Sequence, residues 1–241
     1  MAGHSHWAGI KHKKGRQDNQ RAKLFSKLSR EITVAAKLGA KDPNSNPRLR
    51  SAIQSAKQSN MPKDNIQRAI NKSEISSQAN YQNLRYEGFG PFNVALIIET
   101  LTDNKNRSAA SIRTILSKFG GRLGENGSTS HLFNNCGVLH IEKGIIGDDE
   151  ILEKAINFGA KDCTSFNEKH EIITDLKDFY MVKSNLEKEI KSFSYFGLEW
   201  RSKNYIKLNS EQNSKIVEMM VSLDDLDDVQ NIFINAKINL I

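Results

Sequence analysis

Three of the six histidines, His4, His6 and His12, lie near the start of the chain, where their spacing raises the question of a metal site. His4 and His6 stand two positions apart and would need a third ligand on an ordered backbone. Glycines recur at every sixth position of this segment and oppose such order, since each costs about 1 kcal/mol relative to alanine in a helix. We therefore favour histidines that donate to phosphate or face water, and expect no bound metal and no cofactor.

Positive charge is the strongest chemical signal of the sequence. Residues 1–80 hold 16 Lys/Arg and 5 Asp/Glu, a net charge of +11, whereas residues 81–241 hold 19 and 23, a net charge of −4. Solvated helix faces normally mix signs, so this excess favours a polyanion, whose phosphates Lys and Arg bind without reading base sequence. The predicted nucleic-acid-binding residues are Lys11, His12, Lys13, Lys14, Arg16, Arg21, Lys23, Lys27, Arg30, Arg48, Arg50 and Lys63.

Other patterns have simpler explanations than catalysis or ligand binding. Trp7 either stacks on a base or packs the basic arm onto the helices that follow, and both alternatives stay open. The glycine-rich stretch 120–133 lacks the GxxxxGK[ST] pattern of a phosphate loop, and a helix end followed by a turn explains it better. The acidic cluster at 224–228 lacks the ligand spacing of a calcium loop, and we favour a solvated turn over contact with a basic partner. No local spacing supports a catalytic triad or carboxylate pair, so we expect no enzymatic activity.

Composition is that of an ordinary water-soluble protein, with 38% hydrophobic and 26% charged residues. No run of eighteen apolar residues predicts a membrane span, and no apolar stretch predicts a secretory signal. The N-terminus is basic and acid-poor, but its glycines and its lack of an amphipathic pattern count against a mitochondrial presequence. Cys136 and Cys163 have no CxxC partner, so neither a zinc site nor a disulfide is expected. We predict a reducing, cytoplasmic location.

Three basic helices are predicted to position the cations. Residues 17–38 carry one apolar stripe and end before Gly39. Asn46 and Pro47 are typical of a helix cap and first turn, and Met61-Pro62 begins a third helix. The polar, serine-rich stretch 73–83 is typical of a linker.

Beyond residue 83 the pattern changes to strands alternating with helices. Over 137–201 the predicted order is strand 137–142, helix 148–158, strands 161–166 and 171–175, helix 178–192 and strand 196–201, a complete βαββαβ unit. The remaining strands 92–101, 128–133, 203–208 and 229–235, with helices 108–119 and 211–222, form a second such unit.

The predicted fold class is therefore α+β and multidomain: an N-terminal three-helix basic domain followed by two ferredoxin-like βαββαβ domains, one inserted in the other. The expected domains are residues 1–80 (basic, helical), 81–135 with 202–241 (split ferredoxin-like domain) and 136–201 (inserted ferredoxin-like domain). Three consecutive units would instead leave strand edges unpaired.

Several long motifs resemble the YebC/PmpR family over nearly the whole chain, and this family includes a mitochondrial translational activator of cytochrome oxidase subunit I. The motifs are Met1-Ala2-Gly3-His4-Ser5 with Trp7, Ile10-Lys11-His12, Asn46-Pro47-Arg48-Leu49-Arg50, Asn60-Met61-Pro62-Lys63-Asp64-Asn65-Ile66, Tyr86-Glu87-Gly88, Leu101-Thr102-Asp103-Asn104, Asn106-Arg107 and Asp225-Leu226-Asp227-Asp228-Val229-Gln230-Asn231. The chain departs from the family's usual pattern at 73–79, at Phe92-Asn93, where Gly-Gly is usual, and near 200–208.

This resemblance implies a helical domain, two α/β domains, no enzymatic activity and no cofactor, in a bacterial cytosolic protein. Family members are described as DNA-binding transcriptional regulators and as ribosome-associated factors that help translation through difficult stretches such as proline runs. Of the predicted cations, those from Lys11 to Lys23 match the family's basic N-terminal motif. We expect duplex DNA or ribosomal RNA as partner, no membrane or small-molecule substrate, and a monomer in preference to an oligomer.

Overall fold

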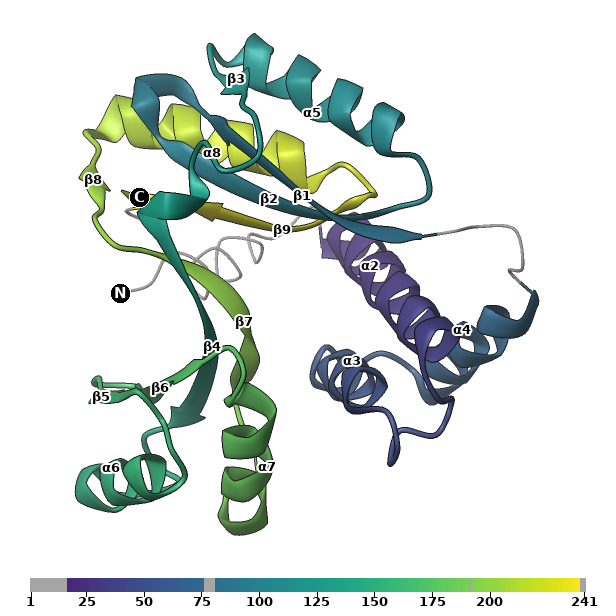
Figure 1. Ribbon diagram of the computed structural model, residues 1–241, viewed down its shortest axis with the longest axis vertical. Helices are drawn as coiled ribbons and strands as arrows, with labels where there is room; N and C mark the ends of the chain where they lie inside the picture. The colour runs from purple at the N-terminus through teal and green to yellow at the C-terminus, as the bar shows by residue number, and fades with distance from the viewer. Residues whose placement is uncertain (1–16, 76–80, 191, 239–241) are drawn as a thin grey trace. The chain divides into compact units, whose positions relative to one another are not determined.

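The computed structural model describes residues 17–75, 81–190 and 192–238. Two compact units are present: Phe133–Lys203 forms one, and the described residues before and after it form the other. The fold is mixed α and β, with N-terminal helices followed by two four-stranded sheets (Figure 1). Division of the first unit into a helical domain and a split α/β domain stays a prediction.

The three predicted basic helices are confirmed. They are α2 (Gln17–Leu38), α3 (Pro47–Gln58) and α4 (Lys63–Ile75). Their apolar stripes meet in one core around the fully buried Ile32, Leu49 and Ala56, while their charged side chains lie mostly outside it. The predicted linker 73–83 is shorter than expected, because α4 continues to Ile75 and a strand begins at Gln82; residues 76–80 lie outside the described residues.

Asn46 joins the end of α2 to the start of α3. Its Oδ1 accepts a hydrogen bond from the backbone N–H of Leu49, as the predicted helix cap requires. Its Nδ2 donates to the carbonyls of Ala35 and Ala40 at 2.9 and 2.7 Å. A Cβ at Gly39 would lie 2.6 Å from this Nδ2, so glycine is required here for close approach; its φ is not positive, so it does not end the helix in the left-handed conformation.

The first sheet has the order β3-β1-β2-β9, and α5 and α8 cover one of its faces (Figure 1). Its apolar core gathers around Leu96, Ile98, Leu116 and Met219, all buried. A separate parallel pair, β8 and β10, accompanies it. The elements are β1 (Gln82–Phe89), η1 (Pro91–Asn93), β2 (Ala95–Thr102), α5 (Lys105–Lys118), β3 (Arg122–Leu123), η2 (Ser130–Leu132), β8 (Ile206–Lys207), α8 (Ser210–Asp224), β9 (Val229–Ile234) and β10 (Ala236–Lys237).

Three predictions for this sheet are wrong. The strand expected at 203–208 is only β8, which pairs with β10 and lies outside the four-stranded sheet. Strand β1 was not expected, because its residues are polar and only Leu84, Tyr86 and Phe89 suggest a strand. Residues 128–133 do not form a strand: the backbone N–H groups of Thr129 and Ser130 each donate to the buried carboxylate of Glu87 at 2.8 Å. This carboxylate ties the segment to β1 and takes the donors that a strand ladder would use.

The inserted unit, Phe133–Lys203, has the predicted βαββαβ order. Its sheet runs β5-β6-β4-β7 with every pair antiparallel, which is the ferredoxin-like arrangement. Leu139, Ile141, Ile172 and Phe179 form its core with both helices. The elements are β4 (Phe133–Glu142), α6 (Asp148–Asn157), β5 (Asp162–Ser165), β6 (Lys169–Asp175), α7 (Phe179–Glu189) and β7 (Tyr195–Ser202).

Gly137 allows a close approach between the central strand β4 and helix α7. A Cβ at this position would lie 2.2 Å from the ring of Phe179 and 2.4 Å from Oγ1 of Thr174. Only the absence of a side chain lets the ring lie against the strand. Among the described helices, none is both long and apolar enough to cross a membrane.

Candidate nucleic-acid interface

Three of the predicted phosphate-binding cations lie along one face of α2 and already have partners within the chain. Lys23, Lys27 and Arg30 follow one another at helical spacing, and each contacts either the last residue of α8 or the loop after it. Lys23 reaches Asp225 at 2.6 Å and Lys27 reaches Asp224 at 2.8 Å. Lys27 is buried in this contact, so its charge is neutralised by the protein itself.

The acidic cluster is therefore not the solvated turn that the sequence favoured. Asp224, Asp225 and Asp228 each pair with a cation of α2. The basic partner that was the less favoured explanation exists, and it belongs to the same chain. A separation of almost two hundred residues hides this pairing from any local pattern.

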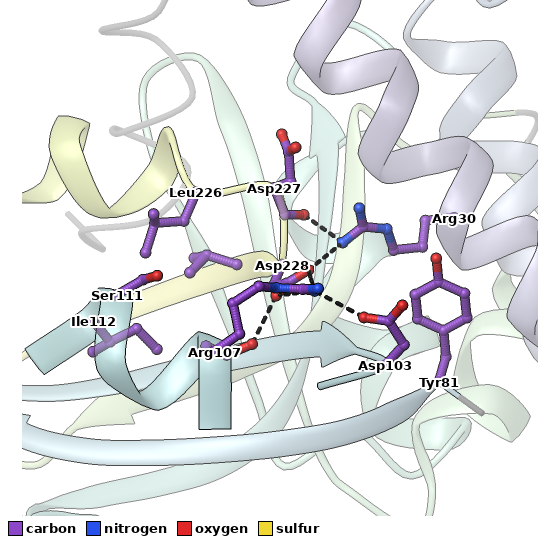
Figure 2. Close-up of a pocket in the computed structure, with 11 residues that line it drawn as sticks. Arg30, Tyr81, Asp103, Arg107, Ser111, Ile112, Leu226, Asp227 and Asp228 are labelled. Carbon is purple, nitrogen blue, oxygen red and sulfur yellow. Dashed lines mark hydrogen bonds and ion pairs between the residues drawn. The ribbon is translucent and has the colours of Figure 1, made fainter. Parts of the chain in front are cut away.

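Asp228 is the centre of the interaction, as Figure 2 shows. Its carboxylate accepts hydrogen bonds from Arg30 at 2.9 Å, Arg107 at 2.9 Å, Ser108 at 2.7 Å and Thr102 at 3.0 Å. Burial alone would raise the pKa of Asp228, but the hydrogen bonds from Ser108, Arg107 and Thr102 and the charge of Arg107 lower it below its ordinary value. The carboxylate is thus held in its charged form.

A pocket of about 400 Å³ opens beside this carboxylate. Arg30, Tyr81, Asp103 and Arg107 line its polar side; the Arg30 guanidinium lies 5.6 Å from the Tyr81 ring and also donates to the carbonyls of Asp227 and Leu101 (Figure 2). Both guanidinium groups are thus engaged with acceptors of the protein. The arrangement fixes α2 against the end of β2 and the start of β9, which is a structural role.

The remaining described cations of the predicted set divide into two kinds. Arg48 forms a two-pronged pair with Glu31, and Arg50 donates to the carbonyls of Pro43 and Asn44. Arg21 is exposed, with its guanidinium 5.3 Å from the Phe25 ring, and Lys63 is exposed at the first turn of α4. Arg48 and Arg50 therefore stabilise the helices locally, whereas Arg21 and Lys63 face solvent.

Sequence reasoning left three exposed cations out of the predicted site. Lys57 on α3 and Arg68 and Lys72 on α4 are exposed, and no ion pair joins them or Lys63 to another residue in the described part of the chain. The sequence could have identified them, because each lies on the polar side of its helix, away from the apolar stripe. We call Lys57, Lys63, Arg68 and Lys72 the α3–α4 cations.

Several predicted residues lie outside the described residues, namely Lys11, His12, Lys13, Lys14 and Arg16, together with His4, His6 and Trp7. Within the ranges that the structure describes, no group of three His, Cys, Asp or Glu side chains is arranged to hold a metal ion. Both cysteines are free thiols.

The inserted unit carries buried charges on the face of its sheet away from the helices. Glu171 accepts from Arg201 at 3.0 and 3.1 Å and lies 2.9 Å from Nε2 of His140, while Arg201 also donates to Glu199. Burial alone would raise the pKa of Glu171, but the hydrogen bonds from His140 and Arg201 lower it to about 2. These groups neutralise one another, so this face offers little net charge to a polyanion.

Comparison with known proteins covers almost the whole chain. Residues 5–75 match the model of the TACO1/YebC protein N-terminal domain, and residues 81–236 match that of the TACO1/YebC second and third domain. A probable transcriptional regulatory protein of Pelagibacter ubique (strain HTCC1062) is 54% identical over 237 residues, covering 98% of each chain. The crystal structure of a conserved hypothetical protein from Aquifex aeolicus matches with a TM-score of 0.83 and 40% identity, again over 98% of each chain.

Proposed function

Because the chain belongs to the TACO1/YebC family, we propose that it is a non-enzymatic, nucleic-acid-binding regulator of gene expression that acts as a DNA-binding transcriptional regulator. The name of the Pelagibacter ubique relative, a probable transcriptional regulatory protein, supports the regulatory role. In this proposal the protein works in the cytoplasm as a monomer, without cofactor, metal or small-molecule substrate.

The observation that carries the proposal is the α3–α4 cations. All four are exposed and without an ion-pair partner among the described residues, and Asp64 is the acid closest to them along α4. Exposed, unpaired Lys and Arg side chains gain most from neutralising phosphates, because binding releases the counterions condensed on the nucleic acid. Lys23, Lys27 and Arg30 contribute less, since the last residue of α8 and the loop after it already neutralise them.

The basic N-terminal residues add positive charge to the interface in the proposal. Lys11, His12, Lys13, Lys14 and Arg16 add charge of the same sign, and a polar arm of this kind is neutralised well by a polyanion. Lys13→Glu with Lys14→Glu tests the arm. Lys23→Glu is best kept out of that variant, because it would also break the ion pair with Asp225.

The test is duplex DNA binding by fluorescence anisotropy at several salt concentrations. A variant with Lys57→Gln, Lys63→Gln, Arg68→Gln and Lys72→Gln should bind at least about tenfold more weakly at 0.1 M salt, and the log–log salt slope should become shallower by roughly 0.9 for each phosphate that is no longer neutralised. The exposed Lys177→Gln and Lys237→Gln provide a control of unchanged affinity. An unchanged affinity and slope in the fourfold variant would remove the α3–α4 cations from the interface.

The second candidate is a ribosome-associated, RNA-binding translation factor that relieves stalling. The contacts between cations and phosphates support this candidate too. Such contacts do not read base sequence, so they suit structured RNA as well as duplex DNA. A competition at physiological salt between ribosomes and excess genomic duplex DNA separates the two. Retention on ribosomes supports the translation role, and transfer to particular DNA fragments supports transcription.

A further inference from the structure

The turn between β1 and β2 holds Phe92 in a backbone conformation that phenylalanine rarely adopts. The φ angles are 61° at Phe92 and 57° at Asn93, and the N–H of Val94 donates to the carbonyl of Pro91 at 3.3 Å. Two central residues with positive φ define the tight turn that normally selects Asn-Gly, because a bulky side chain clashes with the backbone there. Phe92 is therefore a strained choice at this position.

Packing gives little reason for this choice. The Phe92 residue is 42% exposed and is not part of the buried cluster beneath the first sheet. Its ring has the ammonium of Lys215, on α8, at 5.7 Å from its centroid. Strained residues that the fold does not require are concentrated at functional sites, so the exposed ring itself is the feature to explain.

Helix α5 and the short strand β3 after it carry cations and no acids. Residues 105–124 contain five Lys/Arg and no Asp or Glu, although the chain from residue 81 onward is acidic overall. Arg107 is used by Asp103 and Asp228. Arg113, Lys118 and Arg122 are exposed, and within the described chain they form no ion pair.

The C-terminal end of α5, strand β3 and the β1–β2 turn lie at the same end of the first sheet (Figure 1). Arg122 pairs with Phe89 in the β1–β3 ladder, and its guanidinium lies 4.7 Å from the Phe89 ring. Gly121 approaches the turn so closely that a Cβ there would lie 2.9 Å from the Cα of Gly90. Arg122 on β3 thus lies near the turn that displays Phe92.

We propose that Arg113, Lys118, Arg122 and Phe92 bind single-stranded nucleic acid, with phosphates following the three cations and one base stacked on the Phe92 ring. Stacking on an exposed aromatic ring beside a row of cations is how proteins bind single strands without sequence preference. A duplex fits less well, because paired bases hide their faces. On α8, Glu211 and Glu218 flank Lys215 and would repel phosphates. We therefore expect the nucleic-acid strand to follow α5 and not α8.

This site is separate from the α3–α4 cations and does not rest on them. The experiment is therefore made both in the wild-type protein and in the fourfold Gln variant of those cations. If Phe92→Asn also weakens binding of single-stranded nucleic acid in the fourfold variant, the result supports a second site, even if the α3–α4 cations prove unimportant. Loss of the effect there would overturn the independence of the site.

The probe is a single-stranded twelve-nucleotide RNA or DNA with a central 2-aminopurine, whose fluorescence is quenched when the base stacks. Wild-type protein should quench it. Phe92→Asn should lose the quenching and bind about tenfold more weakly, whereas Phe92→Trp should keep both. Tyr180→Ala, which removes a ring of similar exposure from α7, is the control and should behave as wild type. Arg113→Gln with Lys118→Gln and Arg122→Gln should flatten the salt dependence by roughly 0.7 for each phosphate that these cations neutralise in the wild-type protein.

Stability distinguishes loss of the site from loss of the fold. Asparagine tolerates a positive φ, so Phe92→Asn should melt at a higher temperature than wild type while binding the probe more weakly. This combination cannot arise from unfolding. Quenching with either RNA or DNA that depends on Phe92 supports the proposal. Equal quenching and affinity in Phe92→Asn, or equal quenching with the matching duplex, overturns it.

Discussion

The guanidinium of Arg30 donates a 2.9 Å hydrogen bond to the carboxylate of Asp228, which stands 198 residues later in the chain. Arg107 binds the same carboxylate from α5. A single acid thus joins helix α2 to α5 and the start of β9 within the first unit. Arg30, which charge composition alone would assign to nucleic-acid binding, is used for this internal contact.

Asp228→Asn should destabilise the protein by about 2 kcal/mol, because Arg30 and Arg107 would lose their charged partner in a partly buried site. Urea unfolding measures the change. Asp225→Asn is the matched control: its pair with Lys23 is exposed, so a loss below about 1 kcal/mol is expected. Equal effects of the two substitutions would contradict the central role of Asp228.

Acid should weaken the inserted unit through Glu171. Its pKa is about 2 in the fold, below the ordinary value of 4.5, so its stabilising effect is present above about pH 4.5 and is lost as the pH falls towards 2. The full effect corresponds to roughly 3 kcal/mol. Urea titrations at pH 5, 4 and 3 should show this loss in wild type and a flatter pH dependence in Glu171→Gln.

Fluorescence of Trp200, on β7 of the same sheet, can follow this transition if Trp7 is replaced by phenylalanine, because the chain has two tryptophans. A Glu171→Gln protein with the same pH dependence as wild type would show that other carboxylates dominate acid unfolding.

Gly137→Ala should be among the most damaging alanine substitutions in the inserted unit. The added methyl group would overlap the ring of Phe179, and the resulting displacement should cost about 2 to 3 kcal/mol. Gly144→Ala is the control, since nothing lies within 4 Å of its Cβ position. Thermal unfolding of both variants tests this; a similar melting temperature for the two would mean that α7 moves away at little cost.

Cys136 should react slowly with iodoacetamide in the native protein at pH 8. Burial raises the pKa of its thiol to about 11, so little reactive thiolate is present, and burial also raises the pKa of Cys163. Mass spectrometry of labelled protein with and without 6 M urea should show fast labelling only after unfolding. Fast native labelling of Cys136 would indicate that β4 and its neighbours open readily.

Much of the fold could be predicted because local signals and packing agree. The apolar stripe of α2 and the Asn46-Pro47 cap gave the first two helices, and the order of elements gave the inserted ferredoxin-like unit. Strand β1 was not predicted, because backbone pairing with β2 and β3 defines it and its side chains give no apolar pattern. The strand expected at 128–133 failed because Glu87, forty-two residues away, takes its backbone donors.

The candidate interface was harder to predict than the fold, because charge counts do not reveal partners. Lys27 and Lys63 are the same residue type in helices that both carry a net positive charge, yet Lys27 is buried against Asp224 and Lys63 is exposed. The difference depends on the end of α8, which reaches α2 only in the folded chain. The sequence did mark Phe92 as unusual, because the family usually has glycine at this position. That phenylalanine is strained there follows only from its positive φ, which the structure shows.

The strand pairing at the base of the inserted unit has a consequence for how the chain reaches its fold. Phe133 and Ser202 are register partners on β4 and β7, so the first and last strands of the insert lie side by side. If this unit folds early, the long segment between β3 and β8 becomes a short connection. The C-terminal strand β9 can then pair with the first sheet without closing a long disordered loop. Loop-closure entropy grows by about 0.6 kcal/mol per doubling of length, and closing the insert about halves the chain between β2 and β9, so its early formation would remove roughly one such increment from the cost of bringing β9 to β2. The insertion would then act as a folding aid for the sheet that it interrupts.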